Sequence, residues 1–372
     1  MTFPLTDEQQ ELAATVADFL EKRSPENEVR RLMEAGGAPD PTVWAQLTGQ
    51  LGLAGLVVPE EYGGGGFGYL DFALVAERAG AALLVAPLLS TVAAASALML
   101  SADDELKAGC LPALAAGEKV GTLALAEASG SLEAAAVQTA VESGPAGVRL
   151  AGEKMYVVDG TVADLFIVSA RTPAGTVGLY AVDADADGVS VEALQTLDMT
   201  RPQARVVFTD APARPLADDF DAAGLVDRAL ATAAILLAAE QVGGAQRCLD
   251  MAVEYAKVRV QFGKPIGSFQ AIKHKCADML LAVESARSAA YYAAGTLDAG
   301  DPDEVRIAAA LAKAHCSTSY TRVAAENIQI HGGIGFTWEH PAQLYFKRAK
   351  TSEILFGDPV WQRERLATLV GI

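Results

Sequence analysis

The chain has 372 residues, with 29 basic and 47 acidic side chains, so its net charge is −18. A hydrophobic fraction of 51% and a charged fraction of 20% predict a folded chain with a large core and exclude a disordered one. The acidic balance, with a pI near 4.6, argues against nucleic acid and anionic membranes as partners, because both need a basic face.

The N-terminal segment combines neither a basic start nor an apolar run, so we expect no secretory signal and a cytoplasmic location. Four widely spaced cysteines and four histidines show no metal-ligand spacing, and no metal site is expected. Residues 79–100 carry no charge, but Pro87 interrupts them. We therefore expect a buried pair of helices there and no membrane span.

The hydrophobic period changes twice along the chain. Residues 1–118 show a helical period, starting with a capping box formed by Thr6 and Gln9. Residues 119–215 shift towards a period of two, with Gly, Asp and Pro between short apolar runs, and residues 216–372 return to long helical patterns. The pattern predicts an α+β protein with an N-terminal helical domain, a central antiparallel β barrel or sandwich, and a C-terminal four-helix bundle.

Two segments between predicted helices carry residues suited to an anionic cofactor. Arg259 precedes a Phe-Gly-Lys-Pro turn, where a guanidinium can hold a pyrophosphate and Phe262 can cover an aromatic ring. Residues 329–336 end another helix with glycines that allow close backbone approach. Each is equally typical of a plain helix end. Residues 63–68 match G-x-G-x-x-G, but they follow helices and not a strand, so we expect a flexible loop and no dinucleotide site.

Taken in order, these segments resemble the acyl-CoA dehydrogenase family along essentially the whole chain. The matching motifs are Pro-Glu-Glu-Tyr-Gly-Gly at 59–64, Gly-Glu-Lys-Met at 152–155, Arg-x-x-Phe-Gly at 259–263, Gln270, and Gln-Ile-His-Gly-Gly-x-Gly-Phe at 329–336. The resemblance implies FAD chemistry on an acyl-CoA thioester. A carboxylate removes the α proton, the β carbon gives a hydride to the flavin, and electrons pass to an electron-transfer flavoprotein.

The resemblance also implies a cofactor site that two subunits share. The half that holds the ADP portion of FAD is intact here; its residues are Arg259, Phe262, Gln270, Gln329, Gly332 and Gly333. The flavin-ring half departs from the family pattern. Val158 replaces a threonine that hydrogen-bonds the flavin, and the Thr-Glu-Pro-x-Ala-Gly-Ser-Asp loop is reduced to Ala-Glu-Ala-Ser-Gly-Ser at 126–131.

The catalytic glutamate of the family is missing from both of its known positions. Phe356 stands at one position, and a residue close to Ala233 stands at the other. Two carboxylates are weak candidates to replace the base. Asp358 is more typical of a turn before proline, and Glu240, which closes an apolar run, is equally explained by an inter-subunit salt bridge.

Three hypotheses follow. In the first, the chain is a base-less subunit that pairs with a homologous partner in an α2β2 acyl-CoA dehydrogenase, similar to those of actinobacterial steroid side-chain degradation. In the second, it is a self-sufficient homotetrameric enzyme with Asp358 or Glu240 as a relocated base. In the third, it is a flavin-free scaffold subunit, against which the retained Arg259 argues.

Overall fold

The computed structural model of the chain describes residues 5–144, 147–217 and 222–372. Contacts divide it into two compact units that interleave along the sequence. One unit comprises Met1–Arg31, Tyr69–Leu84 and Ala234–Ile372, and the other comprises Leu32–Gly68 and Val85–Ala233. The linear division at residues 118 and 215 stays a prediction.

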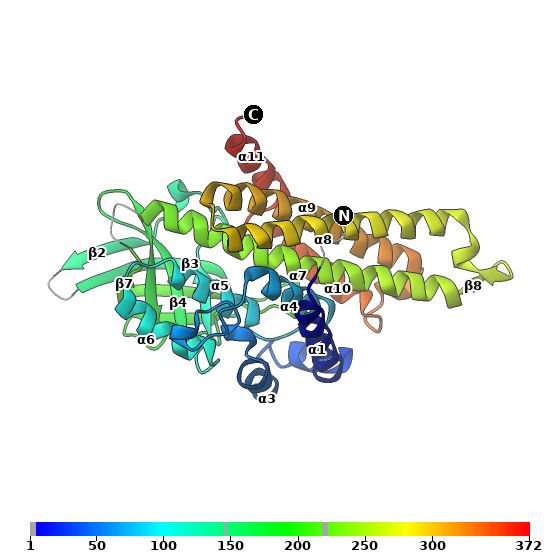
Figure 1. Cartoon of the computed structure of the whole chain (residues 1–372), viewed down its shortest axis with the longest axis horizontal. Helices are drawn as coiled ribbons and strands as arrows, with labels where there is room; N and C mark the ends of the chain where they lie inside the picture. Colours follow the sequence, from blue (N-terminus) through cyan, green and yellow to red (C-terminus); the bar gives the residue numbers. More distant parts are fainter. Residues whose placement is uncertain (1–4, 145–146, 218–221) are drawn as a thin grey trace. The chain divides into compact units, whose positions relative to one another are not determined.

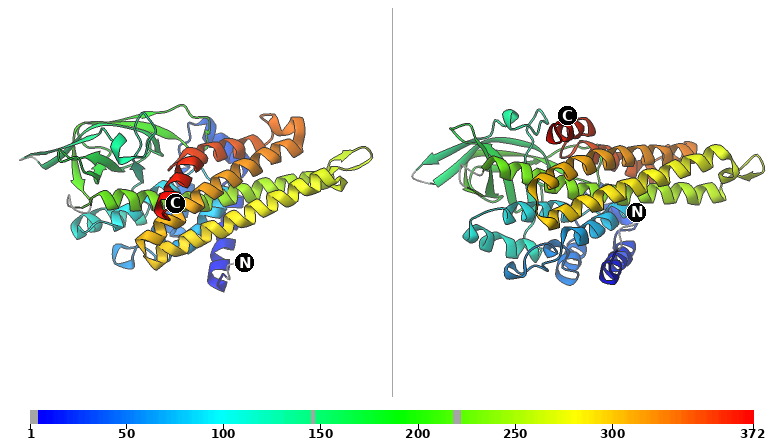
Figure 2. Two further views of the ribbon diagram at one scale, coloured as in Figure 1. Left: turned by 90° about the horizontal axis from the view of Figure 1, so that it is seen from above. Right: turned by 45° about the horizontal axis from the view of Figure 1, so that its top comes forward.

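The first unit is a helical bundle, and its long helices lie side by side in both figures (Figures 1 and 2). Gly80 and Gly243 lie where helices α4 and α7 cross in close contact. A Cβ at Gly243 would lie 1.7 Å from the Glu77 carbonyl oxygen. Small residues thus bring two backbones into direct contact. The helices are α1 (Asp7–Arg23), α2 (Glu26–Glu34), α4 (Tyr69–Ala81), α7 (Ala222–Val258), α8 (Gln270–Ala299), α9 (Pro302–His331), α10 (Ala342–Ile354) and α11 (Pro359–Leu369), of which α2 and α7 extend into the other unit.

Local signals mark the ends of several helices, and one of them, the capping box, was predicted. The Thr6 hydroxyl accepts a hydrogen bond from the Gln9 backbone amide, and the Gln9 side-chain oxygen accepts one from the Thr6 backbone amide, so the capping box is confirmed. Gly300, with φ of 79°, ends α8, and Asp301 caps α9 immediately afterwards. A glycine in the left-handed region and an N-cap aspartate together make the sharp reversal between two antiparallel helices.

The second unit is built on a seven-stranded sheet, in which β4, β2, β3, β7 and β5 pair in a closed ring. Its interior is apolar, with Phe166 and Phe208 packed edge to face. The expected antiparallel character needs a correction, because β4 pairs in parallel with β1 and also, through Arg171 and Ala140, with β2. The strands are β1 (Gly121–Ala124), β2 (Ala140–Gly144), β3 (Gly147–Val158), β4 (Leu165–Arg171), β5 (Val177–Asp183), β6 (Val189–Ala193) and β7 (Gln203–Pro215), and the helices are α3 (Pro41–Ala45), α5 (Leu88–Met99) and α6 (Asp104–Ala115).

The glycine-rich loop at 63–68 is tightly held, which corrects the expectation of flexibility. The amides of Gly65 and Gly66 donate to carbonyls of Gly55 and Val58 at 2.9 Å each. A Cβ at Gly64 would lie 2.0 Å from the Val58 carbonyl oxygen. Gly64 is therefore needed for close packing, and among the described residues 5–62 there is no strand of the kind that a dinucleotide motif requires.

Residues 79–100 form the end of α4, a turn and α5, as expected. Within the described residues, no helix is both long and apolar enough to cross a membrane. Short turns complete the structure: η1 (Gln46–Gln50, a π-helical turn), η2 (Leu53–Gly55), η3 (Glu60–Tyr62), η4 (Ala134–Ala136), η5 (Ile266–Ser268) and η6 (Gly332–Phe336).

Candidate functional site

The strongest candidate site begins at the hairpin between α7 and α8, where β8 (Val260–Gln261) pairs with β9 (Lys264–Pro265) at one end of the bundle (Figure 1). Phe262 and Gly263, with φ of 53° and 77°, form a two-residue turn. The Phe262 ring is 91% exposed and lies edge to face with Phe269. An aromatic residue held in the left-handed region and in solvent is strained and unpacked, which is typical of a binding surface.

This hairpin is basic although the chain is acidic. Between Glu254 and Asp278 there are five Lys or Arg residues and no Asp or Glu: Lys257, Arg259, Lys264, Lys273 and Lys275. Of these, Lys275 is paired with Glu326, and Lys264 lies over the Phe269 ring. A cluster of exposed cations favours a ligand with several negative charges, such as a diphosphate. The net charge of the chain hides this cluster.

The second group of predicted residues lies at the end of α9. Gln329 is in its last turn, and Gly332 follows with φ of 63°. The His331 ring stacks at 4.3 Å on Tyr255, which lies one helical turn before Arg259. The two predicted groups, 259–270 and 329–333, are therefore at the same end of the bundle. Burial lowers the pKa of His331, although a hydrogen bond to the Asn327 carbonyl opposes the shift.

A cavity of about 470 Å³ opens between α7 and α8 beside the hairpin. Lys257 and Lys273 line it together with Ile272 and the half-buried Cys276. Apolar walls with two cations suit a ligand that has both a flat apolar part and an anionic part. Reasoning from motifs missed both lysines, although the run of basic residues around Arg259 signals them.

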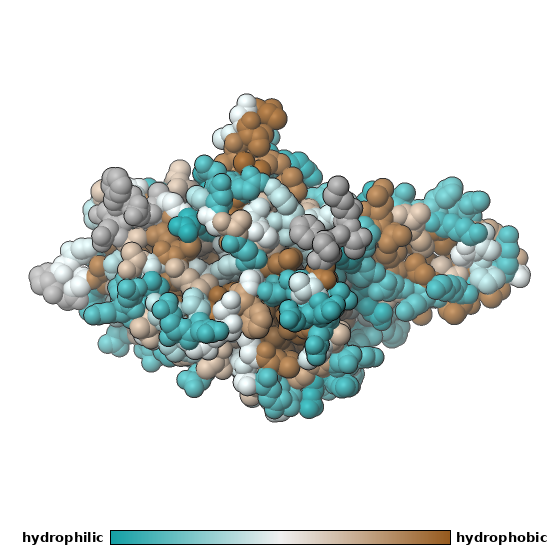
Figure 3. Space-filling view, in the orientation of Figure 1, coloured by the Kyte–Doolittle hydropathy of each residue, from teal (hydrophilic) through white to brown (hydrophobic). Residues whose placement is uncertain are grey.

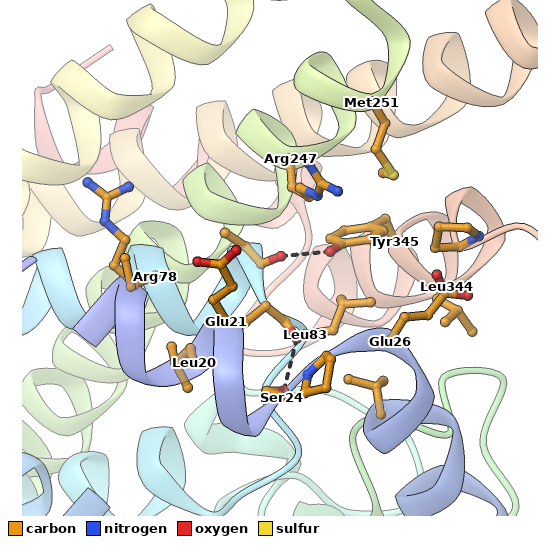
Figure 4. A pocket seen from close by; sticks show the side chains of 16 residues that line it. Leu20, Glu21, Ser24, Glu26, Arg78, Leu83, Arg247, Met251, Leu344 and Tyr345 are labelled. Carbon is orange, nitrogen blue, oxygen red and sulfur yellow. Dashed lines mark hydrogen bonds between the residues drawn. The ribbon is translucent and has the colours of Figure 1, made fainter. Parts of the chain in front are cut away.

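A second cavity of about 500 Å³ lies between α1, α2, α4, α7 and α10 (Figure 4). Arg78 and Arg247 face it, and so do Glu21 and Glu26, so the charges around it balance. The Tyr345 hydroxyl at its edge donates to the Ala81 carbonyl at 2.6 Å. None of the site residues expected from the sequence lines it, which sets it apart from the hairpin site.

The strand with the flavin-ring motif is organised around a buried cation in the sheet unit. Lys154 is fully buried, and its ammonium donates to Glu127 at 2.8 Å and to Ser169 at 3.1 Å. Burial lowers the pKa of Lys154 to about 8. Burial opposes the charge of Glu127 as well, but hydrogen bonds from Lys154, Thr139 and Gln138 outweigh it and lower the pKa of Glu127.

Residues of the flavin-ring motif itself offer little to a cofactor. The Val158 side chain is buried and apolar, and its carbonyl accepts a hydrogen bond from Thr122 at 2.7 Å. Ser129 accepts from the Ser131 amide within its own turn. Val158 therefore cannot donate the side-chain hydrogen bond that the family's threonine hydroxyl would give at this position.

The two expected base positions hold no carboxylate. Phe356 lies in the turn between α10 and α11 with φ of 57°, and Ala233 is buried in α7. The Asp358 carboxylate accepts hydrogen bonds from the amides of Val360 and Trp361, so it caps α11. Glu240 is buried and paired with Arg348 of the same chain at 2.9 Å, so the expected salt bridge does not require a second subunit.

Comparison with family models assigns nearly the entire chain. Residues 6–118 match the N-terminal domain of acyl-CoA dehydrogenases, residues 122–211 match the middle domain, and residues 223–370 match the C-terminal domain. The chain belongs to the acyl-CoA dehydrogenase family. Its members are FAD-dependent oxidoreductases that act on the CH–CH bond of acyl-CoA thioesters, so the expected fold, enzyme class and cofactor are confirmed at the level of the family.

Among similar proteins, acyl-CoA dehydrogenase IpdE2 of Mycolicibacterium smegmatis is 38% identical over 366 residues, which are 97% of this chain and 98% of that protein. The structure of a variant of the Tcur3481–Tcur3483 steroid acyl-CoA dehydrogenase is 30% identical with a TM-score of 0.90 and covers 98% of both chains. The ChsE4–ChsE5 complex from Mycobacterium tuberculosis is 29% identical with a TM-score of 0.91, over 100% of this chain and 99% of that one. The resemblance to the steroid-type subunits agrees with these relatives.

Proposed function

We propose that this acyl-CoA dehydrogenase is the base-less subunit of a hetero-oligomer, in which it holds the ADP portion of an FAD shared with a homologous partner. The observation that carries the proposal is the contrast between two parts of one chain. The basic hairpin and the end of α9 retain every expected ADP-binding residue, whereas Phe356 stands in place of a catalytic carboxylate.

The hairpin residues fit the anionic half of the cofactor. Arg259 can pair with the diphosphate through two parallel hydrogen bonds, and Lys257 and Lys273 add positive charge at the adjacent cavity. The exposed Phe262 ring provides an apolar cover, and Gly332 and Gly333 leave room for close backbone contact, since a Cβ at either position would meet nothing within 4 Å. FAD, when bound, accepts the hydride from the β carbon of the acyl-CoA.

The chain also needs a surface for its partner, and the bundle exposes apolar residues. Leu281 of α8 is 70% exposed, and Val360 and Ile372 are exposed around α11, whose end forms a hydrophobic projection at the top of Figure 3. Large obligate interfaces are hydrophobic, so such residues favour burial against another subunit. Two of the similar solved structures are named for two proteins each, Tcur3481–Tcur3483 and ChsE4–ChsE5. This supports a homologous partner for the present chain.

We further propose that the partner supplies the carboxylate base and that the substrate is a bulky polycyclic acyl-CoA, as the steroid relative suggests. Donation of electrons to an electron-transfer flavoprotein and a cytoplasmic location belong to the same proposal. Asp358 caps α11, and Glu240 forms a buried ion pair. A self-sufficient enzyme that uses either residue as a relocated base is therefore the weaker alternative.

The test is the visible spectrum of the purified chain, alone and after co-expression with a candidate homologous subunit. We expect a colourless chain alone and a yellow complex. Arg259→Ala should lower the flavin content of the complex at least tenfold, whereas Arg306→Ala, which removes a half-buried arginine paired with Asp303, should leave it unchanged. A chain that binds flavin alone and is bleached anaerobically by an acyl-CoA would contradict the proposal.

A further inference from the structure

A lysine in the middle of α9 is fully buried and has all its donors engaged. Lys313 has 0% exposure, and its ammonium donates to Ser317 Oγ at 2.9 Å, to the Glu353 carbonyl at 3.1 Å and to the Gly357 carbonyl at 3.0 Å. An ammonium has three protons, so these contacts use each of them. Nothing in the functional motifs of the sequence includes this residue.

Two of the three acceptors belong to the end of α10 and the turn that follows. Glu353 is in the last helical turn, where carbonyl oxygens have no partner within the helix and the helix dipole is negative. Gly357 lies three residues beyond the end of that helix. A single cation therefore fixes the end of α10 and the start of the path to α11.

The turn that Lys313 holds is strained. Phe356 and Gly357 are consecutive residues with φ of 57° and 93°. A phenylalanine avoids the left-handed region, so such a conformation persists only where surrounding contacts determine it. Gln362 adds a contact from α11, because its side-chain amide donates to the Phe356 carbonyl at 2.7 Å.

On its other side, Lys313 is linked to α7. Ser317 accepts a hydrogen bond at 2.9 Å from the side-chain amide of Gln241, the residue after Glu240. The charged or titratable groups that act on Lys313 are Cys316, Glu353 and Asp358. Burial lowers the pKa of Lys313 to about 7 in spite of them, so the lysine is kept at a cost in stability that an apolar residue would avoid.

We infer that Lys313 is a positioning residue, which clamps the turn between α10 and α11 and so fixes residue 356 in its left-handed conformation. That residue 356 occupies the family's base position rests on the proposed function, but the clamp itself does not. A rigid turn at this position would present a glutamate in a base-carrying subunit and here presents Phe356.

The experiment is hydrogen–deuterium exchange of the full chain, followed by mass spectrometry of peptides that cover residues 350–362. Lys313→Met removes the three donors and keeps the length of the side chain. We expect the amides of Leu355 and Gly357 to exchange at least tenfold faster, with the rates in α8 unchanged. Lys313→Arg, which keeps the charge and two or more donors, should restore most of the protection, and Lys275→Met is the control for loss of a lysine in the same bundle.

Unchanged exchange at residues 354–358 in Lys313→Met would overturn the inference. If that variant does not fold, Lys313→Gln decides the question, because its amide keeps a polar donor in the site but is too short to reach both carbonyls of the turn. A faster exchange confined to the turn would then support the clamp, and a rate equal to that of the wild type would overturn it. Neither result depends on flavin, so the proposed function can fail independently.

Discussion

Arg348 Nη1 lies 2.9 Å from Glu240 Oε1, and both side chains are buried. The pair joins α10 to α7 at the end of an apolar stretch of α7, at a place where a lone carboxylate would be costly. Glu240 is thus accounted for by a partner in its own chain. This removes the argument that its burial marks a catalytic base.

Glu240→Gln should therefore affect stability and not chemistry. Removing one member of a buried ion pair leaves the other uncompensated, and we expect the free energy of unfolding to fall by about 3 kcal/mol. The measurement is urea denaturation at pH 7, with Glu254→Gln as the control, since Glu254 is an exposed residue of the same helix. Loss of turnover in a complex that is fully folded would instead identify Glu240 as a catalytic residue.

At Asp358 the capping role can be separated from a catalytic role, because asparagine can still cap the helix but cannot act as a base. Asp358→Asn should leave both stability and turnover of the complex unchanged, since the side-chain oxygen still accepts from the amides of Val360 and Trp361. Asp358→Ala should lower the free energy of unfolding by about 1 kcal/mol. Thermal melts and steady-state kinetics measure both variants, and a large fall in kcat for Asp358→Asn alone would contradict the capping role.

The buried Lys154 predicts a pH dependence of stability. Its native pKa, lowered to about 8, lies below the unfolded value of 10.5, so between these values the unfolded state binds one more proton. The free energy of unfolding should then rise with pH in this window, by up to about 1.4 kcal/mol per pH unit from this group. Denaturation from pH 7 to 10.5 should show that the free energy of unfolding of the wild type rises with pH relative to that of Lys154→Met. A constant difference would contradict the lowered pKa.

The order of helical and β segments could be predicted from periodicity, and the ends of helices from Thr6, Gly300 and Asp301, because these signals are local. The buried lysines could not. In α9, alanine and serine surround Lys313, and a helix without a distinct apolar face does not indicate which of its residues are buried. Lys154 is equally hidden, since its partner Glu127 lies on a different segment.

The part of the candidate site that lies in one continuous motif, at 259–263, could be predicted from the sequence. The contacts between residues that are far apart in the sequence could not. The stacking of His331 on Tyr255, which brings together the two groups predicted to bind ADP, joins positions 76 residues apart. The parallel pairing of β1 with β4 was missed for the same reason: alternation along a strand does not specify its neighbour. The left-handed conformation of Phe262 was also missed, because phenylalanine gives no signal for it.

The left-handed conformation of Phe262 allows the stability of the hairpin to be separated from its binding of flavin. Phe262 is 91% exposed with φ of 53°, so asparagine, which tolerates this region, should relieve strain and lose little buried surface. Phe262→Asn should keep or raise the free energy of unfolding, by up to about 1 kcal/mol, while the complex loses flavin during gel filtration. Val260→Asn, a change at an exposed neighbour in β8, is the control and should retain flavin. If Phe262→Asn retained flavin as well, the exposed ring would have no part in holding the cofactor.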